Sequence, residues 1–128
     1  MATINIKTRK QKQVIDITDL VYKEIAKQSN GVCILFLTHT TAALTTADLD
    51  PGSDLDMLDA FQVMVPVMKY RHPHNPDHMP DHILSSLIGS SLSIPVRDGK
   101  LVLGQWQKIV LIELDGPRDR QIILSFLS

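Results

Sequence analysis

The sequence predicts an α+β fold: a single domain with a mostly antiparallel β-sheet or sandwich and about three helices. The chain has 128 residues, 44% of them hydrophobic and 21% charged, which suits one compact core and is short for two. Alternating or β-branched segments occur near both ends, and three segments with helical spacing of apolar residues lie between them. Turn signals, rather than long crossovers, separate the C-terminal strands and favour antiparallel pairing. We therefore expect residues 1–128 to form one domain.

The N-terminal part predicts a hairpin, a helix and a central strand. Residues 3–7 and 14–17 have the pattern of short strands, and the basic stretch 9–12 between them is interpreted as a solvated hairpin tip. A helix begins at Thr18, a plausible N-cap. Its apolar face is expected to contain Leu20, Val21 and Ile25. The apolar run 32–38 then predicts a central strand that is buried on both faces.

Two further helices and a proline-rich loop are predicted in the middle of the chain. One helix follows the turn at 50–52, and its buried face should contain Leu55, Leu58, Phe61 and Val65. Residues 66–80 hold four of the seven prolines, a density that excludes a helix or a central strand. The third helix begins at Pro80. Its apolar face should contain Ile83, Leu84, Leu87 and Ile88, with His82, Ser85 and Ser86 on the other face.

The C-terminal part predicts four antiparallel strands. They are expected over residues 91–96, 100–103, 108–114 and 121–127. Gly-containing turns at 97–99 and 115–118 separate the first pair and the last pair. These strands complete the predicted sheet.

Charge, hydropathy and cysteine content exclude several classes of protein. The net charge of -1 argues against a nucleic-acid binder. No apolar stretch approaches the length of a membrane span, and residues 1–7 lack the apolar core of a signal peptide. The single cysteine, Cys33, lies in an apolar run and suggests a buried, inert thiol. We expect a cytoplasmic protein that binds neither nucleic acid nor membrane.

Three of the five histidines are candidates for chemistry because each lies at the end of a predicted element. His39 follows the buried strand, His72 lies in the proline-rich loop, and His82 is in the first turn of a helix. Three imidazoles with one open position would form a catalytic zinc site. The alternative is that backbone groups or water satisfy these histidines, and the residue types alone favour it.

Other polar segments also have two interpretations. The two arginines of residues 115–120 could hold a phosphate or carboxylate, or could pair with nearby aspartates or with Glu113. The hydroxyls of residues 38–46 could bind an oxyanion beside His39, or could simply belong to a strand. Trp106 could line a pocket or an interface, or could anchor the core.

Several separated strings together resemble one family. These strings are residues 39–45, 50–51, 70–72, 79–83, 89–101, 104–107 and 113–118, and they resemble the YjbQ family, also called UPF0047, over the whole chain. Members of that family are described as secondary thiamine-phosphate synthase-like proteins. The resemblance implies a YjbQ-type α+β fold, usually a homotrimer, with a histidine-containing site at the subunit boundary that holds a metal such as zinc.

The resemblance also implies which residues form the site. The metal would be held by His39, His72 and His82, with His39 and His82 also catalytic. The substrate-binding residues would be Thr40, Thr41, Gly116 and Arg118. Many members carry Asn-Glu-Asn before the Asp-Pro pair, whereas this chain has Ala-Asp-Leu, so the acid–base role could pass only to Asp48. His74 and His78 match no family histidine.

The implied function is a metal-assisted enzyme that acts on a small phosphorylated substrate. In the thiamine-phosphate synthase version, a pyrimidine diphosphate is joined to a thiazole phosphate with loss of pyrophosphate. The alternative is a non-catalytic homotrimer that binds a small anion or cofactor and uses the histidines structurally.

Overall fold

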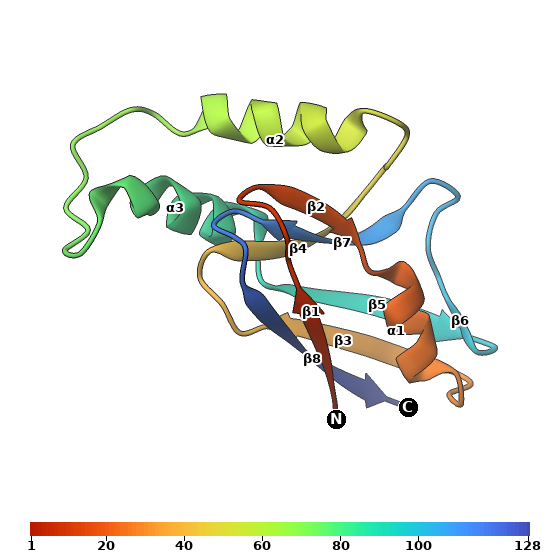
Figure 1. The fold of residues 1–128 in the computed structure, drawn as a ribbon. Helices are drawn as coiled ribbons and strands as arrows, with labels where there is room; N and C mark the ends of the chain where they lie inside the picture. Colours follow the sequence, from red (N-terminus) through yellow and green to blue (C-terminus); the bar gives the residue numbers. More distant parts are fainter.

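The computed structural model describes residues 1–128 as two antiparallel sheets with two helices on one outer face (Figure 1). The strands are β1 (Ala2–Lys7), β2 (Gln13–Asp16), β3 (Gly31–Leu37), β4 (Ala42–Ala47), β5 (Ser91–Arg97), β6 (Lys100–Leu101), β7 (Lys108–Glu113) and β8 (Asp119–Leu127). The helices are α1 (Thr18–Ile25), α2 (Ser53–Met64), α3 (Met79–Ile88) and the 3₁₀ turn η1 (Pro76–His78). The predicted α+β class is confirmed.

The two sheets enclose the main core. The larger sheet has the order β1-β8-β3-β5-β6 and the smaller has the order β2-β7-β4, with every pairing antiparallel. Side chains alternate along β7, so Ile109 and Leu111 pack in the core between the sheets. Val110 and Ile112 face a smaller core beneath α2 and α3. None of the helices combines the length and apolar character needed to cross a membrane.

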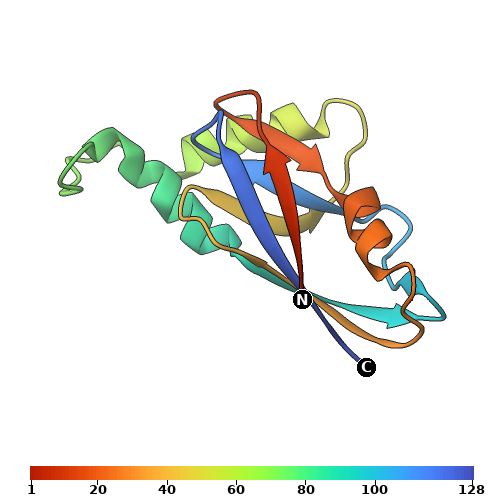
Figure 2. The same ribbon diagram turned by 60° about the horizontal axis from the view of Figure 1, so that its bottom comes forward.

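The predicted N-terminal hairpin is wrong. β1 pairs with β8 in the larger sheet, and β2 pairs with β7 in the smaller sheet, so residues 8–12 cross from one sheet to the other (Figure 2). Each strand finds a longer neighbour there and gains an apolar core on one face. The crossing is not a free solvated tip either, because Lys12 Nζ lies 2.6 Å from Asp81 Oδ1.

The strand predicted over residues 32–38 is central, as expected, but it is buried on one face only. β3 lies between β8 and β5. Cys33, Leu35 and Leu37 face the core, while the Phe36 side chain is exposed on the outer face. Burial raises the pKa of the Cys33 thiol to about 11, which keeps it protonated and unreactive.

The predicted faces of the helices need correction. In α3 the buried positions are Asp81, Leu84 and Ser85, whereas Leu87 is 72% exposed. The Ser85 hydroxyl donates to the Ala42 carbonyl at 2.6 Å, so a small polar residue lets α3 approach β4 closely.

In the other two helices, some of the apolar side chains that were predicted to be buried are exposed. No residue of α2 is buried: Leu58 and Phe61 are half-buried and Leu55 is exposed. In α1, Val21 and Ile25 are buried but Leu20 is exposed. Thr18 does not cap α1 through its side chain; its hydroxyl accepts the Ile109 N–H at 2.9 Å. The spacing of apolar residues therefore predicted where these helices lie, but it did not predict which of their side chains are buried.

Candidate functional site

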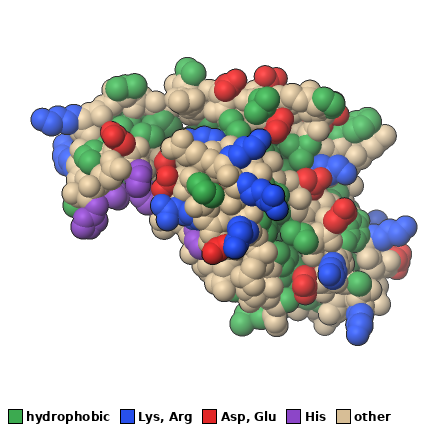
Figure 3. Space-filling view, viewed as in Figure 1, with side chains coloured by type: hydrophobic (Ala, Val, Ile, Leu, Met, Phe, Trp, Pro, Cys, Tyr) green, Lys and Arg blue, Asp and Glu red, His purple; other side chains and the backbone are tan.

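Two connections between the sheets meet at one end of the molecule and enclose a polar cavity. Residues 38–41 lead from β3 to β4, and residues 114–118 lead from β7 to β8. The cavity has a volume of about 660 Å³, and none of its eleven lining residues is hydrophobic. They are Thr38, His39, Thr40, Thr41, His78, His82, Asp115, Pro117, Arg118, Asp119 and Arg120. Figure 3 shows the histidines gathered on this side of the molecule.

His82 has one ring nitrogen fixed and the other available. It is half-buried in the first turns of α3, and its Nδ1 lies 2.9 Å from the Thr40 carbonyl oxygen. A carbonyl accepts only, so Nδ1 carries the proton in the neutral ring. Nε2 then has a free lone pair with no partner in the chain, which makes His82 the group best placed to accept a proton from a ligand.

His39 is held in the complementary way. Its Nε2 accepts the Gln121 N–H at 2.8 Å, so Nδ1 carries the proton. Burial lowers the pKa of His39, and the positive charges of Arg120 and Arg118 lower it further, against an opposing effect of Glu113. His39 is therefore a neutral hydrogen-bond donor at the cavity wall.

The other histidines come from the loop that precedes α3. The His72 ring stacks on His82, with centroids 5.0 Å apart and planes 25° apart, and its Nδ1 accepts the Asn75 N–H at 3.4 Å. His72 does not line the cavity, whereas His78 does, with its Nδ1 3.9 Å from Asp115 Oδ2. No role was predicted for His78 from the sequence because it matches no family histidine. The 3₁₀ turn η1, directly before α3, brings it to the cavity.

The three predicted zinc ligands do not present three free nitrogen donors in this arrangement. A zinc ion needs an unprotonated lone pair from each histidine. The hydrogen bonds that His39 and His72 accept occupy those lone pairs, and only His82 keeps one. No three His, Cys, Asp or Glu side chains form a group that could hold a metal ion. Zinc binding by these histidines would require two hydrogen bonds to break.

Arg118 both pairs with an aspartate and faces the cavity, so the two interpretations of this turn hold together. Its Nε donates to the Asp115 carbonyl at 2.8 Å, and its Nη2 lies 3.0 Å from Asp115 Oδ2. Nη1 has no partner in the chain, and about half of the side chain is exposed. Arg118 can therefore still offer N–H donors to an anion.

Gly116 shapes this turn without lining the cavity. A Cβ at this position would lie 2.3 Å from the Lys10 carbonyl oxygen and 2.8 Å from Glu113 Cγ. The Gly116 N–H donates to the Gln11 carbonyl at 2.9 Å. Only glycine lets the turn approach the 8–12 segment this closely.

A buried ion pair behind the cavity was missed by sequence reasoning as part of the site. The side chains of Glu113 and Arg120 are 0% and 2% exposed and form two hydrogen bonds to each other. Arg120 also donates to Thr41 Oγ1 at 2.9 Å, and Thr8 donates to Glu113 at 2.7 Å. Burial raises the pKa of Glu113, but the hydrogen bonds from Arg120, Thr8 and the Asp115 N–H outweigh it and hold the pKa below its ordinary value. This pair fixes the position of Thr41 and of the turn that carries Arg118.

Of the other predicted residues, Thr40 and Thr41 line the cavity, whereas Asp48 and Trp106 do not. Thr40 is exposed at the cavity, whereas Thr41 is buried against Arg120. Asp48 follows the opposite end of β4, roughly 20 Å along the strand, where its carboxylate accepts the Asp50 N–H at 3.0 Å. Trp106 is 66% exposed and is not a core anchor.

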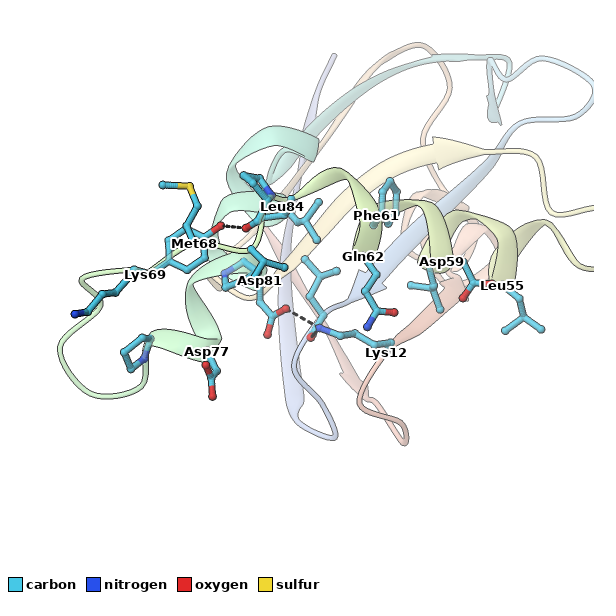
Figure 4. A pocket seen from close by; sticks show the side chains of 18 residues that line it. Lys12, Leu55, Asp59, Phe61, Gln62, Met68, Lys69, Asp77, Asp81 and Leu84 are labelled. Atoms are coloured by element: carbon cyan, nitrogen blue, oxygen red, sulfur yellow. Dashed lines mark hydrogen bonds and ion pairs between the residues drawn. The ribbon is translucent and has the colours of Figure 1, made fainter.

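A second cavity, of about 780 Å³ and with a half-hydrophobic lining, lies between α2, the following loop and α3. Nine of its 18 lining residues are hydrophobic, among them Leu58, Phe61 and Leu84. Figure 4 shows the ion pair of Lys12 and Asp81 among the side chains that line this cavity. This second cavity shares no lining residue with the polar cavity that contains the histidines.

Comparisons with known proteins place the chain in a family. The family described as UPF0047 protein YjbQ-like matches residues 2–128. A UPF0047 protein of Archaeoglobus fulgidus is 36% identical over 125 residues, covering 97% of this chain and 98% of that protein. The UPF0047 protein YugU of Bacillus subtilis is 33% identical over 131 residues, covering 100% and 99%.

Solved structures agree with this assignment. A YjbQ/UPF0047-family protein of Clostridium acetobutylicum has a TM-score of 0.90 and 38% identity, covering 99% of this chain and 100% of that one. A protein of Sulfolobus solfataricus with unknown function has a TM-score of 0.91 and 35% identity, covering 99% and 95%. The chain belongs to the YjbQ-like UPF0047 family.

Proposed function

We propose that the polar cavity binds a small phosphorylated molecule and that the protein is an enzyme acting on it. The observation that carries this proposal is the free Nε2 of His82 in a wholly polar cavity that also holds Arg118. A proton-transfer group beside a guanidinium suits chemistry in which a phosphate leaves or is held. A thiamine-phosphate synthase-like transfer is the candidate reaction.

In that reaction the thiazole nitrogen forms a bond to the methylene carbon of the pyrimidine, and the bond from that carbon to the diphosphate oxygen breaks. Pyrophosphate leaves with the electron pair. Arg118 Nη1 and the Nδ1–H of His39 would stabilise its negative charge. His82 would first take up a proton from solvent at Nε2 and would then donate that proton to the pyrophosphate oxygen as it leaves.

The test uses two variants of His82 that differ in one contact. The amide nitrogen of His82→Asn can still donate to the Thr40 carbonyl, but the variant has no Nε2, whereas His82→Ala loses both. We expect both to lower kcat for conversion of the pyrimidine diphosphate and thiazole phosphate by about 100-fold or more. Arg118→Ala should mainly raise KM for the diphosphate. Full turnover by His82→Asn would contradict the catalytic proposal.

A non-catalytic anion-binding protein is the second candidate. The fixed contacts of His39, His72 and Arg118 within the chain favour it, because they resemble a rigid binding site. A thermal-shift experiment with pyrophosphate, combined with a product assay on the substrate pair, separates the two candidates. A binder gains stability with the ligand and releases no product from the substrate pair.

Zinc at His39, His72 and His82 remains a prediction that one substitution can test. His72→Phe keeps a flat ring to stack on His82 but removes the nitrogen donors. If His72 is a ligand, protein purified without metal and then loaded with zinc should bind one equivalent as wild type and markedly less as the variant. Equal zinc content would show that His72 only stacks.

We also propose that the chain forms a homotrimer with the site at its subunit boundary. Apolar side chains of α2 and of the segment after it are exposed, including Val63, Met64, Val67 and Met68. The same segment continues into the loop that brings His72 and His78 to the site. A cytoplasmic location is proposed from the free, buried Cys33.

A further inference from the structure

A third cavity adjoins the site on the other side of His82. It has a volume of about 300 Å³, and none of its seven lining residues is hydrophobic. It shares His39, Thr40 and His82 with the larger polar cavity. The remaining lining residues are Ser85, Ser86, Gly89 and Ser90, from the C-terminal half of α3 and the turn into β5. The two histidines and Thr40 therefore line both cavities.

The two cavities differ in charge. Arg118, Arg120, Asp115 and Asp119 line only the larger one. Apart from the shared histidines, the smaller one is lined by hydroxyl groups and backbone. Serine hydroxyls donate and accept, so they match uncharged groups such as ring nitrogens, amines and hydroxyls. A second phosphate would meet no arginine or lysine there, and an apolar group would meet no apolar wall.

Two features characterise the part of this smaller cavity that α3 and the following turn provide. Gly89 has φ +115°, a conformation that favours glycine, and a Cβ added there would meet no atom within 4 Å. Ser85 is held against β4 by its bond to the Ala42 carbonyl, so α3 lies close to the sheet and Ser86 is left exposed at the cavity.

We propose that the site has two compartments and takes an organic phosphate or diphosphate whose uncharged, hydrogen-bonding organic part lies in the serine-lined cavity. The phosphate end lies in the cavity of Arg118, and the bond between the two parts passes His82. This inference rests on the proposed function and adds to it the position of the organic group and the residues that select it, chiefly Ser86 and Ser90.

The experiment compares two probes by isothermal titration calorimetry: inorganic pyrophosphate and the pyrimidine-methyl diphosphate. Ser86→Leu places an apolar side chain in the smaller cavity from an exposed helical position. Ser93→Leu, on an exposed position of β5 outside both cavities, is the matched control. Ser90→Val removes a hydroxyl from another part of the lining of the smaller cavity and tests the effect of Ser86→Leu independently.

The wild type and Ser93→Leu should bind the organic diphosphate at least tenfold more tightly than pyrophosphate. Ser86→Leu and Ser90→Val should lose this gain while binding pyrophosphate within about twofold of wild type. Equal affinity of wild type for the two probes, or a gain retained in both cavity variants, would overturn the two-compartment site alone. No pyrophosphate binding by wild type would overturn the proposed function and this inference with it.

Discussion

The Glu113 carboxylate accepts four hydrogen bonds in a position that solvent does not reach. The donors come from Thr8, the backbone of Asp115 and two nitrogens of Arg120, so one side chain ties the turn between β7 and β8 to the segment after β1. Arg120 in turn holds Thr41 through its hydroxyl and carbonyl. At the scale of single residues, this buried pair positions the cavity, and His82 keeps an Nε2 that has no partner in the chain.

Removing one partner of this pair should strongly destabilise the protein. Arg120→Leu leaves the Glu113 carboxylate buried without its main partner, which costs about 3–5 kcal/mol for such pairs. Arg118→Leu breaks an ion pair that is half-exposed, and such pairs contribute about 0–1 kcal/mol. Urea unfolding of both variants measures the difference. Equal losses would show that burial does not distinguish the two arginines.

Stability should depend on pH through His39. Its folded pKa is lowered below the ordinary 6.5, so the unfolded chain takes up a proton first as the pH falls. The contribution of neutral His39 is fully present above pH 6.5 and is lost as the pH falls toward the lowered folded pKa. The lowered pKa of Glu113 acts separately, because its contribution is lost only below about pH 4.5.

The measurement is the free energy of unfolding between pH 7.5 and 5 for wild type and His39→Gln. The variant cannot titrate at this position, so the difference between the two proteins should shrink as the pH falls. A difference that stays constant across this range would contradict the assignment of a neutral, hydrogen-bonded His39.

At the scale of elements, the turn between β7 and β8 is held by its neighbours. The Gly116 N–H binds the Gln11 carbonyl, the Thr8 N–H binds the Arg118 carbonyl, and the Arg118 N–H binds Thr8 Oγ1. The 8–12 segment passes beside this turn only because β1 and β2 belong to different sheets. The topology that the sequence did not reveal therefore builds one wall of the site.

Replacing Gly116 should disturb the fold and the cavity together. Gly116→Ala places a Cβ against the Lys10 carbonyl, and overpacking of this kind costs about 1–3 kcal/mol. Gly104→Ala is the matched control, since its Cβ would meet only the movable Gln107 side chain at 3.1 Å. Thermal unfolding should show a clear loss for the first variant and little for the second; similar losses would contradict the role given to this close approach.

Most strand and helix locations could be predicted because their apolar periods are local properties of the chain; β4, in the threonine-rich segment, was left open. Pairing partners could not, because β1 and β2 are near in sequence yet each pairs with a strand from the other end of the chain. The covered face of α3 was also misjudged: Ser85 faces β4, and hydropathy favours apolar residues there.

The candidate site could be predicted in part. The family resemblance named His39, His82 and Arg118, and all three line one cavity. It could not place Asp48, which lies at the far end of β4. Glu113 was considered only as an ion-pair partner because it ends an apolar strand and its burial depends on contacts across the whole fold.

At the scale of the whole molecule, the exposed apolar side of α2 predicts self-association. A homotrimer should have a mass of about 43 kDa, three times the 14.3 kDa chain, by light scattering after size-exclusion chromatography. Charges at Val63, which is 84% exposed, and at Val67 should reduce the mass to that of a monomer.

Leu127→Asp, an exposed apolar position far from α2 in the sequence, is the control and should leave the trimer intact. A monomeric wild type would contradict the proposed assembly. A trimer that survives charges at both Val63 and Val67 would place its interface on another face.

We propose that the histidine and arginine cavity is the functional site for a phosphorylated ligand. A crystal structure with thiophosphate, located by anomalous scattering from its sulfur, tests this for wild type and Arg118→Ala. We expect one anomalous peak between His82 Nε2 and Arg118 in the wild type and a greatly weakened peak in the variant. A peak elsewhere, no peak, or an equal peak in Arg118→Ala would contradict it.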